Sequence, residues 1–156
     1  MPEKIKVALV GLGNCFSGLI QGIEYYSKNP SQKVTGIIHE NLRDYTIHDI
    51  DFVAGFDVGA NKIGKPINEA IYESPNMVNW IEKNDMPKAN GTVYESPALD
   101  GVGIWVENKV KPIESEKSES ELREEIIKVL EETGVEVIVS YLPVGSEKAT
   151  QFWAQV

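Results

Sequence analysis

Short apolar runs, separated by polar stretches rich in glycine and proline, organise this chain. A nearly continuous apolar run over residues 4–10 predicts a strand that is buried on both faces. Apolar residues then return at helical spacing over 14–27, which predicts a helix. Residues 28–50 break this pattern and are interpreted as a long insertion with a short strand near 34–38. A second buried strand is expected over 52–57.

The second half of the chain is less regular, and its strongest signal is a helix over 119–133. Ser118 and Glu121 have the spacing of a capping box at the start of that helix. Gly134 is a suitable residue for its carboxyl end. The other predicted elements are a short helix over 65–72, short strands near 92–94 and 104–106, a strand over 135–140, and a last helix capped by Ser146.

Strands that alternate with helices predict an α/β fold, here a Rossmann-type doubly wound parallel sheet. A complete dinucleotide-binding fold of this type has about six strands. Fewer strands are secure in this sequence, so we expect residues 1–156 to form one domain with an incomplete sheet. In this interpretation the domain is the amino-terminal part of a longer protein. The alternative is that the less regular segments supply the remaining strands.

The turn after the first predicted strand contains the pair Gly11 and Gly13, directly before the first predicted helix. Gly11 permits a tight turn, and Gly13 lets a pyrophosphate approach the backbone. The free N–H groups at the start of the helix attract its negative charge. Phe16 stands where the fingerprint has its third glycine, which places the usual close contact between helix and strand in question. The alternative is a tight turn without a ligand.

Asp57 is expected at the end of the second buried strand. A carboxylate there accepts hydrogen bonds from the ribose hydroxyls and repels a 2′-phosphate, which favours NAD over NADP. Its separation from Gly13 exceeds the usual ~20 residues, and the insertion at 28–50 accounts for the excess. The alternative is a carboxylate that caps a helix or a loop. Lys62 and Lys65, just downstream, are expected to be solvated surface charges; the alternative is that they weaken the discrimination against NADP.

A third candidate segment leaves the strand expected over 135–140. It begins with Ser140, Tyr141, Leu142 and Pro143. Ligands of open α/β sheets bind at the carboxyl ends of the strands, so these residues are predicted to flank the cofactor. The alternative is a simple connection between a strand and a helix.

Composition limits the other classes of function. The net charge of −9 argues against nucleic acid as a partner, because phosphate binding needs clustered Lys and Arg. No run of about 18 apolar residues is present, so no membrane span is expected. Because the start lacks a signal-peptide layout and Cys15 is the one cysteine, a cytoplasmic location is expected. Cys15 has no evident base beside it, and the spacing of His39 and His48 matches no compact zinc motif.

Several stretches in order carry a family resemblance. They are residues 10–15 (VGLGNC) with Ser17 and 21–26 (QGIEYY), 38–40 (IHE) with Tyr45 and 49–50 (DI), 56–58 (FDV) with 62–65 (KIGK), 97–103 (PALDGVG) and 140–146 (SYLPVGS). Together they resemble inositol-1-phosphate synthase of the archaeal and actinobacterial type, across nearly the whole chain.

This resemblance implies an isomerase of inositol and phospholipid biosynthesis that uses NAD without net consumption. Glucose 6-phosphate would be oxidised, cyclised by an intramolecular aldol step and reduced again to inositol phosphate. The resemblance also implies a homotetramer and, in archaeal members, a divalent metal. The residues implied to bind NAD are Gly11, Gly13, Asn14 and Cys15 at the pyrophosphate, Asp57 at the ribose, and Ser140, Tyr141, Leu142 and Pro143 further along.

Members of that family are longer, and their catalytic lysines and tetramer-forming sheet are implied to lie outside the matched stretches. No residue of this chain is therefore assigned general acid or base work, and the chain alone is expected to be inactive. Two other functions stay open. One is an NAD-dependent sugar or polyol dehydrogenase, which releases NADH. The other is a non-catalytic nucleotide-binding module, against which an exposed apolar sheet edge would argue.

Overall fold

The structure is a computed structural model that describes residues 3–28, 36–103 and 107–156. The strand expected near 104–106 lies outside the described residues, as does the first part of the strand expected near 34–38. Residues 36–38 form no strand, so that part of the prediction is wrong.

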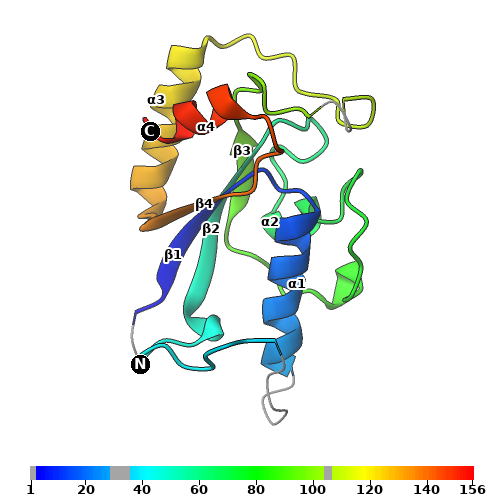
Figure 1. Cartoon of the computed structure of the whole chain (residues 1–156), viewed down its shortest axis with the longest axis vertical. Coiled ribbons are helices and arrows are strands. Elements are labelled where there is room, and N and C mark those ends of the chain that lie inside the picture. Colours follow the sequence, from blue (N-terminus) through cyan, green and yellow to red (C-terminus); the bar gives the residue numbers. More distant parts are fainter. Residues whose placement is uncertain (1–2, 29–35, 104–106) are drawn as a thin grey trace.

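Among the described residues, a sheet of four parallel strands forms the centre of the structure (Figure 1). Its strands are β1 (Ile5–Val10), β2 (Ile50–Asp57), β3 (Thr92–Glu95) and β4 (Val137–Ser140). Their order is β3-β2-β1-β4, the first four positions of the Rossmann order. The predicted α/β class and doubly wound parallel sheet are therefore confirmed.

Helices cover both faces of this sheet (Figure 1). The described helices are α1 (Asn14–Lys28), α2 (Ile67–Ala70), α3 (Glu119–Thr133), α4 (Glu147–Trp153) and the short 3-10 helices Ile47–Asp49 and Lys83–Asp85. Helices α1 and α2 pack on one face, while α3 and α4 pack on the other. The described helices include none that is long and apolar enough to cross a membrane.

Strand β1 lies in the middle of the sheet and is apolar on both faces because both faces are covered. Val7 and Leu9 pack against α1 and α2. Ala8 and Val10 alternate with them and pack against α3 and α4. This explains the unbroken apolar run in the sequence, which is typical of a central parallel strand.

The missing third glycine of the fingerprint is compensated by a different arrangement. Phe16 is fully buried in the core between the sheet and α1. The close approach occurs one strand away, where a Cβ added to Gly55 of β2 would lie 3.1 Å from the Leu12 side chain. The absence of a side chain at Gly55 therefore leaves space for the Leu12 side chain, so that the turn of residues 11–13 can pack closely against the sheet.

Both ends of α3 follow the local sequence signals. The Ser118 side chain accepts a hydrogen bond from the Glu121 backbone, and the Glu121 carboxylate accepts one from the Ser118 N–H. Gly134 ends the helix in the left-handed conformation, with φ of 68°. The predicted capping box and glycine stop are both confirmed.

The start of α4 differs from the prediction. The Ser146 hydroxyl donates to the Pro143 carbonyl at 2.6 Å and does not cap the helix with its side chain. The carboxylate of Asp100 accepts hydrogen bonds from the Lys148 and Ala149 N–H groups, each at 2.9 Å. These bonds hold the pKa of Asp100 below its ordinary value. The loop around Asp100 is thereby fastened to α4.

Substitution by alanine should have opposite effects on stability at the glycine that ends α3 and at a glycine inside α1. Gly134→Ala should lower the free energy of unfolding by about 1 kcal/mol, because an L-residue is strained in the left-handed region. Gly22→Ala should raise it by about 0.5–1 kcal/mol, because alanine favours a helix and the added methyl meets no atom within 4 Å. Urea unfolding of both variants checks this pair. Shifts of the same sign would contradict the assigned backbone conformations.

The cap by Asp100 predicts a pH dependence. Because the folded-state pKa is lowered, the stability that Asp100 adds is present above its unfolded value of 3.8 and is lost as the pH falls through the folded value. The Asp100→Asn variant should therefore melt below the wild type near neutral pH, and the gap should close in acid. Melting curves across a pH series measure it. A gap that stays constant in acid would contradict the charged cap.

Candidate functional site

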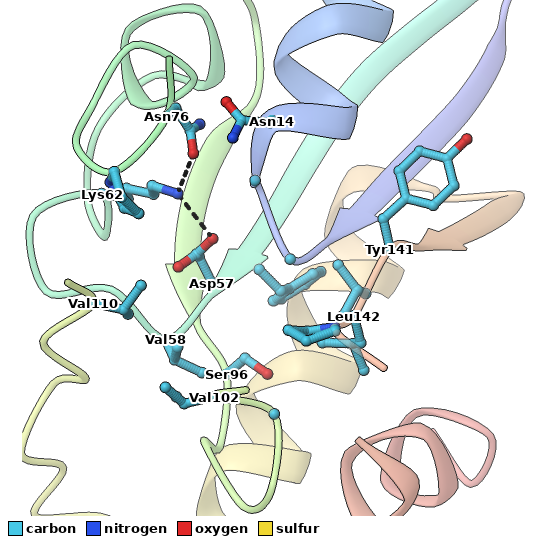
Figure 2. Close-up of a pocket in the computed structure, with 17 residues that line it drawn as sticks. Asn14, Asp57, Val58, Lys62, Asn76, Ser96, Val102, Val110, Tyr141 and Leu142 are labelled. Atoms are coloured by element: carbon cyan, nitrogen blue, oxygen red, sulfur yellow. Dashed lines mark hydrogen bonds and ion pairs between the residues drawn. The ribbon is translucent and has the colours of Figure 1, made fainter. Parts of the chain in front are cut away.

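An open pocket lies at the carboxyl ends of the strands (Figure 2). Its cavity volume is about 200 Å³, and it is lined by residues at or directly after the ends of β1, β2, β3 and β4. Its described lining consists of Val10, Gly11, Gly13, Asn14, Phe56, Asp57, Val58, Lys62, Pro75, Asn76, Ser96, Gly101, Val102, Val110, Tyr141, Leu142 and Pro143.

Gly11 stands at the point where the strand order reverses, between the ends of β1 and β4. Its N–H donates to the Phe56 carbonyl at 2.9 Å, and the Tyr141 N–H donates to the Val10 carbonyl at 3.0 Å. Its φ is 81°, and an added Cβ would lie 3.3 Å from the Tyr141 carbonyl oxygen. Both the conformation and the close approach therefore require glycine here. Open α/β sheets bind ligands at this reversal.

Gly13 faces open space at the start of α1. A Cβ added to it would meet no atom within 4 Å. Its carbonyl accepts the hydrogen bond from the Ser17 N–H at 3.0 Å, so α1 begins directly after it. The N–H groups of a first helical turn have no partner within the helix, and they carry the positive end of its dipole. An anion in the pocket can thus reach the end of α1 unhindered by a side chain.

Asp57 is buried at the end of β2, and both of its carboxylate oxygens already hold backbone donors. The Leu12 N–H donates to Oδ2 at 2.8 Å, and the Gly59 N–H donates to Oδ1 at 2.8 Å. Its predicted position at the strand end is confirmed. The structure adds a role inside the protein, because this carboxylate fixes the middle residue of the glycine turn. Contact with a ribose stays a prediction.

Lys62 was expected on the surface, and this prediction is wrong. The residue is 4% exposed. Its ammonium group donates to the Leu12 carbonyl at 2.7 Å and to Asn76 Oδ1 at 3.3 Å, and it lies 3.6 Å from Asp57 Oδ2 (Figure 2). Buried charged groups are paired in this way with surrounding acceptors. Lys65 does pair at the surface, with Glu73 at 2.8 Å.

Asn14 takes part in the site through its side chain. Its Oδ1 accepts a hydrogen bond from the Met77 N–H at 2.7 Å. The neighbouring Asn76 donates to the Leu12 carbonyl at 2.9 Å. The segment around residues 76–77 is therefore fastened to the start of α1 and forms one wall of the pocket.

The residues after β4 divide into two groups. Tyr141, Leu142 and Pro143 line the pocket. Ser140 is exposed at the end of β4 and does not belong to the described lining, and the same holds for Cys15 at the start of α1. The Tyr141 ring stacks on Phe16 with centroids 4.4 Å apart. The structure thus gathers most, though not all, of the predicted binding residues around one space.

Three polar residues of this pocket escaped the sequence interpretation. Lys62 looked like an ordinary loop lysine, since this residue type is rarely buried. Asn76 lies in a stretch without a regular pattern. Ser96 directly follows β3 and was also missed. The weak strand signal over 92–94 could have indicated it, since residues at the carboxyl end of a strand line such pockets.

Metal ligands do not gather in the described part of the chain. No group of three or more His, Cys, Asp or Glu side chains there has the arrangement of a metal site. His48 Nδ1 lies 3.0 Å from the Ser27 hydroxyl, which links the insertion to the end of α1. His39 is exposed.

Curated relatives match almost the entire chain. The inositol-3-phosphate synthase of Mycolicibacterium smegmatis is 41% identical over 153 residues, which are 97% of this chain and 40% of the relative. The corresponding enzyme of Mycobacterium tuberculosis is 39% identical over the same shares. That of Corynebacterium glutamicum is 40% identical over 152 residues, again 97% and 40%. The chain therefore spans about two fifths of the length of these relatives.

Solved structures share the fold. Ari2 superposes with a TM-score of 0.76 at 27% identity, covering 98% of this chain and 43% of Ari2. A myo-inositol-1-phosphate synthase-related protein of Thermotoga maritima superposes with a TM-score of 0.68 at 23% identity, covering 90% of this chain and 35% of that protein. No protein-family model matches the chain. The predicted resemblance is confirmed: the chain is a relative of the inositol-3-phosphate synthases, matching the amino-terminal part of those enzymes along nearly its full length.

Proposed function

We propose that this chain is the NAD-binding part of an inositol-3-phosphate synthase. One observation carries the proposal: the turn Gly11–Gly13 opens into a pocket at the start of α1, where the strand order reverses. The names of the relatives support the choice of enzyme. The whole enzyme is proposed to act on glucose 6-phosphate in inositol biosynthesis, in the cytoplasm and as a homotetramer.

The chemistry of the turn fits the diphosphate of a dinucleotide. A Cβ added to Gly13 would meet no atom within 4 Å beyond its neighbours in the chain, so the backbone there is open to a ligand. The first turn of α1 supplies N–H donors and a positive dipole end, which attract a diphosphate. The flanking apolar residues Val58, Val102 and Leu142 are suited to the adenosine and nicotinamide parts, since ligand pockets combine apolar walls with a few polar anchors.

The charges in the pocket favour NAD over NADP. Among the described residues of the lining, Lys62 alone carries a positive charge. Its ammonium group is already bonded to the Leu12 carbonyl and to Asn76. A 2′-phosphate would therefore find the carboxylate of Asp57 nearby without a free cation to balance it.

When bound, NAD supplies a reversible acceptor for hydride, so that an oxidised intermediate is reduced again before release. The residues of this chain bind and orient the dinucleotide. We assign none of them a proton-transfer role, and we propose that the 156-residue chain alone is inactive. A divalent metal, if the whole enzyme uses one, is proposed to find its ligands outside the described residues.

Strand β4 is an edge strand of the sheet that the described residues form, which favours the synthase over a self-contained nucleotide-binding module. Val137 and Ile138 of this strand are 44% and 38% exposed. Apolar edge strands usually pair with, or are covered by, further protein. The relatives are more than twice as long as this chain, and we propose that the additional part covers this strand.

The Gly13→Val variant tests the binding site. The side chain would project into open space, so the fold should persist while the diphosphate loses its place. We expect calorimetry to show NAD affinity reduced by at least about tenfold, with an unchanged melting temperature. Gly22→Val, inside α1 and likewise with no atom within 4 Å of the added Cβ, is the matched control and should bind normally. Normal NAD binding by Gly13→Val would refute the proposed site.

Turnover separates the synthase from a dehydrogenase. For the whole enzyme that carries this chain, we expect glucose 6-phosphate to give inositol phosphate without accumulation of NADH, because the hydride returns to the product. Absorbance of NADH and chromatography of the products measure both quantities. Net accumulation of NADH would favour a sugar or polyol dehydrogenase instead.

A further inference from the structure

Both groups of the Leu12 peptide backbone are held by side chains from other parts of the chain. The N–H donates to Asp57 Oδ2 at 2.8 Å. The carbonyl accepts from Lys62 Nζ at 2.7 Å and from Asn76 Nδ2 at 2.9 Å. Leu12 is the residue between the two glycines, so its orientation determines the shape of the turn.

Lys62 also contacts the other two side chains (Figure 2). Lys62 Nζ lies 3.3 Å from Asn76 Oδ1 and 3.6 Å from Asp57 Oδ2. The loop after β2 folds back to make this possible, with the Lys62 N–H bonded to the Gly59 carbonyl at 2.9 Å. Asn76 is anchored in turn by its bond to the Ile71 carbonyl at 2.9 Å. We call Asp57, Lys62 and Asn76 the turn clamp.

Lys62 has its acceptors inside the protein. Its side chain is 5% exposed, and the groups that it faces are the Leu12 carbonyl, Asn76 and Asp57. Two of its three ammonium donors form hydrogen bonds, to Leu12 and Asn76, and Asp57 Oδ2 lies at ion-pair distance, 3.6 Å. Its charge balances the buried Asp57 carboxylate, and it is poorly placed to contact a phosphate directly.

We propose that Lys62 and Asn76 are positioning residues for the diphosphate of the nucleotide. They act with Asp57 on the Leu12 peptide and hold the glycine turn in its binding shape before the ligand arrives. Preorganisation of this kind raises affinity, because the turn loses no further freedom on binding. The inference rests on the proposed NAD-binding function and deepens it. In this proposal the main role of Asp57 is to hold the Leu12 N–H and so to fix the glycine turn, and contact with a ribose is secondary.

Two ligands distinguish positioning from a general structural role. ADP carries the diphosphate, whereas adenosine lacks it. We expect Lys62→Met to weaken ADP binding by about tenfold, the size of a lost bond to a charged group, while adenosine binding changes less than about twofold. Lys62→Arg should recover part of the ADP affinity. Lys65→Met is the matched control, because Lys65 pairs with Glu73 at the surface.

Asn76→Ala provides an independent variant in case loss of Lys62 unfolds the chain. It should show the same selective loss of ADP affinity. Its matched control is Asn61→Ala, since Asn61 bonds to the Ser74 carbonyl in a nearby loop and does not touch Leu12. Equal losses for ADP and adenosine, or no loss for either in a folded variant, would overturn the proposal.

Amide hydrogen exchange tests the clamp without any nucleotide. In the free chain the Leu12 amide should be protected, and Asn76→Ala and Lys62→Met should accelerate its exchange by at least about tenfold as the turn loosens. Asn61→Ala should leave it unchanged. If the wild-type chain binds neither ADP nor NAD, the proposed function is wrong. The exchange rates then still test whether Lys62 and Asn76 hold the Leu12 peptide. An unprotected Leu12 amide in the wild type would overturn it.

Discussion

The site depends on one fixed peptide unit, that of Leu12 between Gly11 and Gly13. Its N–H is bound by Asp57 at the end of β2, and its carbonyl by Lys62 and Asn76, which lie further along the chain. The sheet brings these groups to one place, because the carboxyl ends of parallel strands meet at one edge. The exposed start of α1 then faces the pocket, which is the property that the proposed function requires.

The rest of the fold holds this peptide unit in position. Gly55 makes room for the Leu12 side chain, and the Gly11 N–H is bonded to the Phe56 carbonyl. On the opposite wall, Asp100 fastens its loop to α4. The walls of the pocket are thus held by bonds between segments far apart in the sequence.

The sequence alone predicts the features that depend on local patterns. The strand of residues 4–10, the helix that follows the glycine turn, and the capped helix over 119–133 all occur with nearly the expected ends. The position of Asp57 was predictable for the same reason, since it directly follows an apolar strand. The short strand near 92–94 also occurs, as β3.

Predictions failed where long-range contacts replace local ones. Ser146 has the right position for a cap, yet Asp100 caps α4 from 48 residues away. Lys62 looks solvated in the sequence, and burial beside Asp57 becomes evident only when β2 and its loop are folded. The local sequence around Asn76 does not indicate its role. That role depends on the folding of its loop, which brings Asn76 to the Leu12 carbonyl.

A crystal structure of the chain with NAD tests the central claim most directly. The account predicts a diphosphate beside Gly13, within hydrogen-bonding distance of the first amides of α1, with the Leu12 peptide still bound by Asp57, Lys62 and Asn76. A dinucleotide bound at any other place, or a glycine turn left empty at saturating NAD, would contradict it.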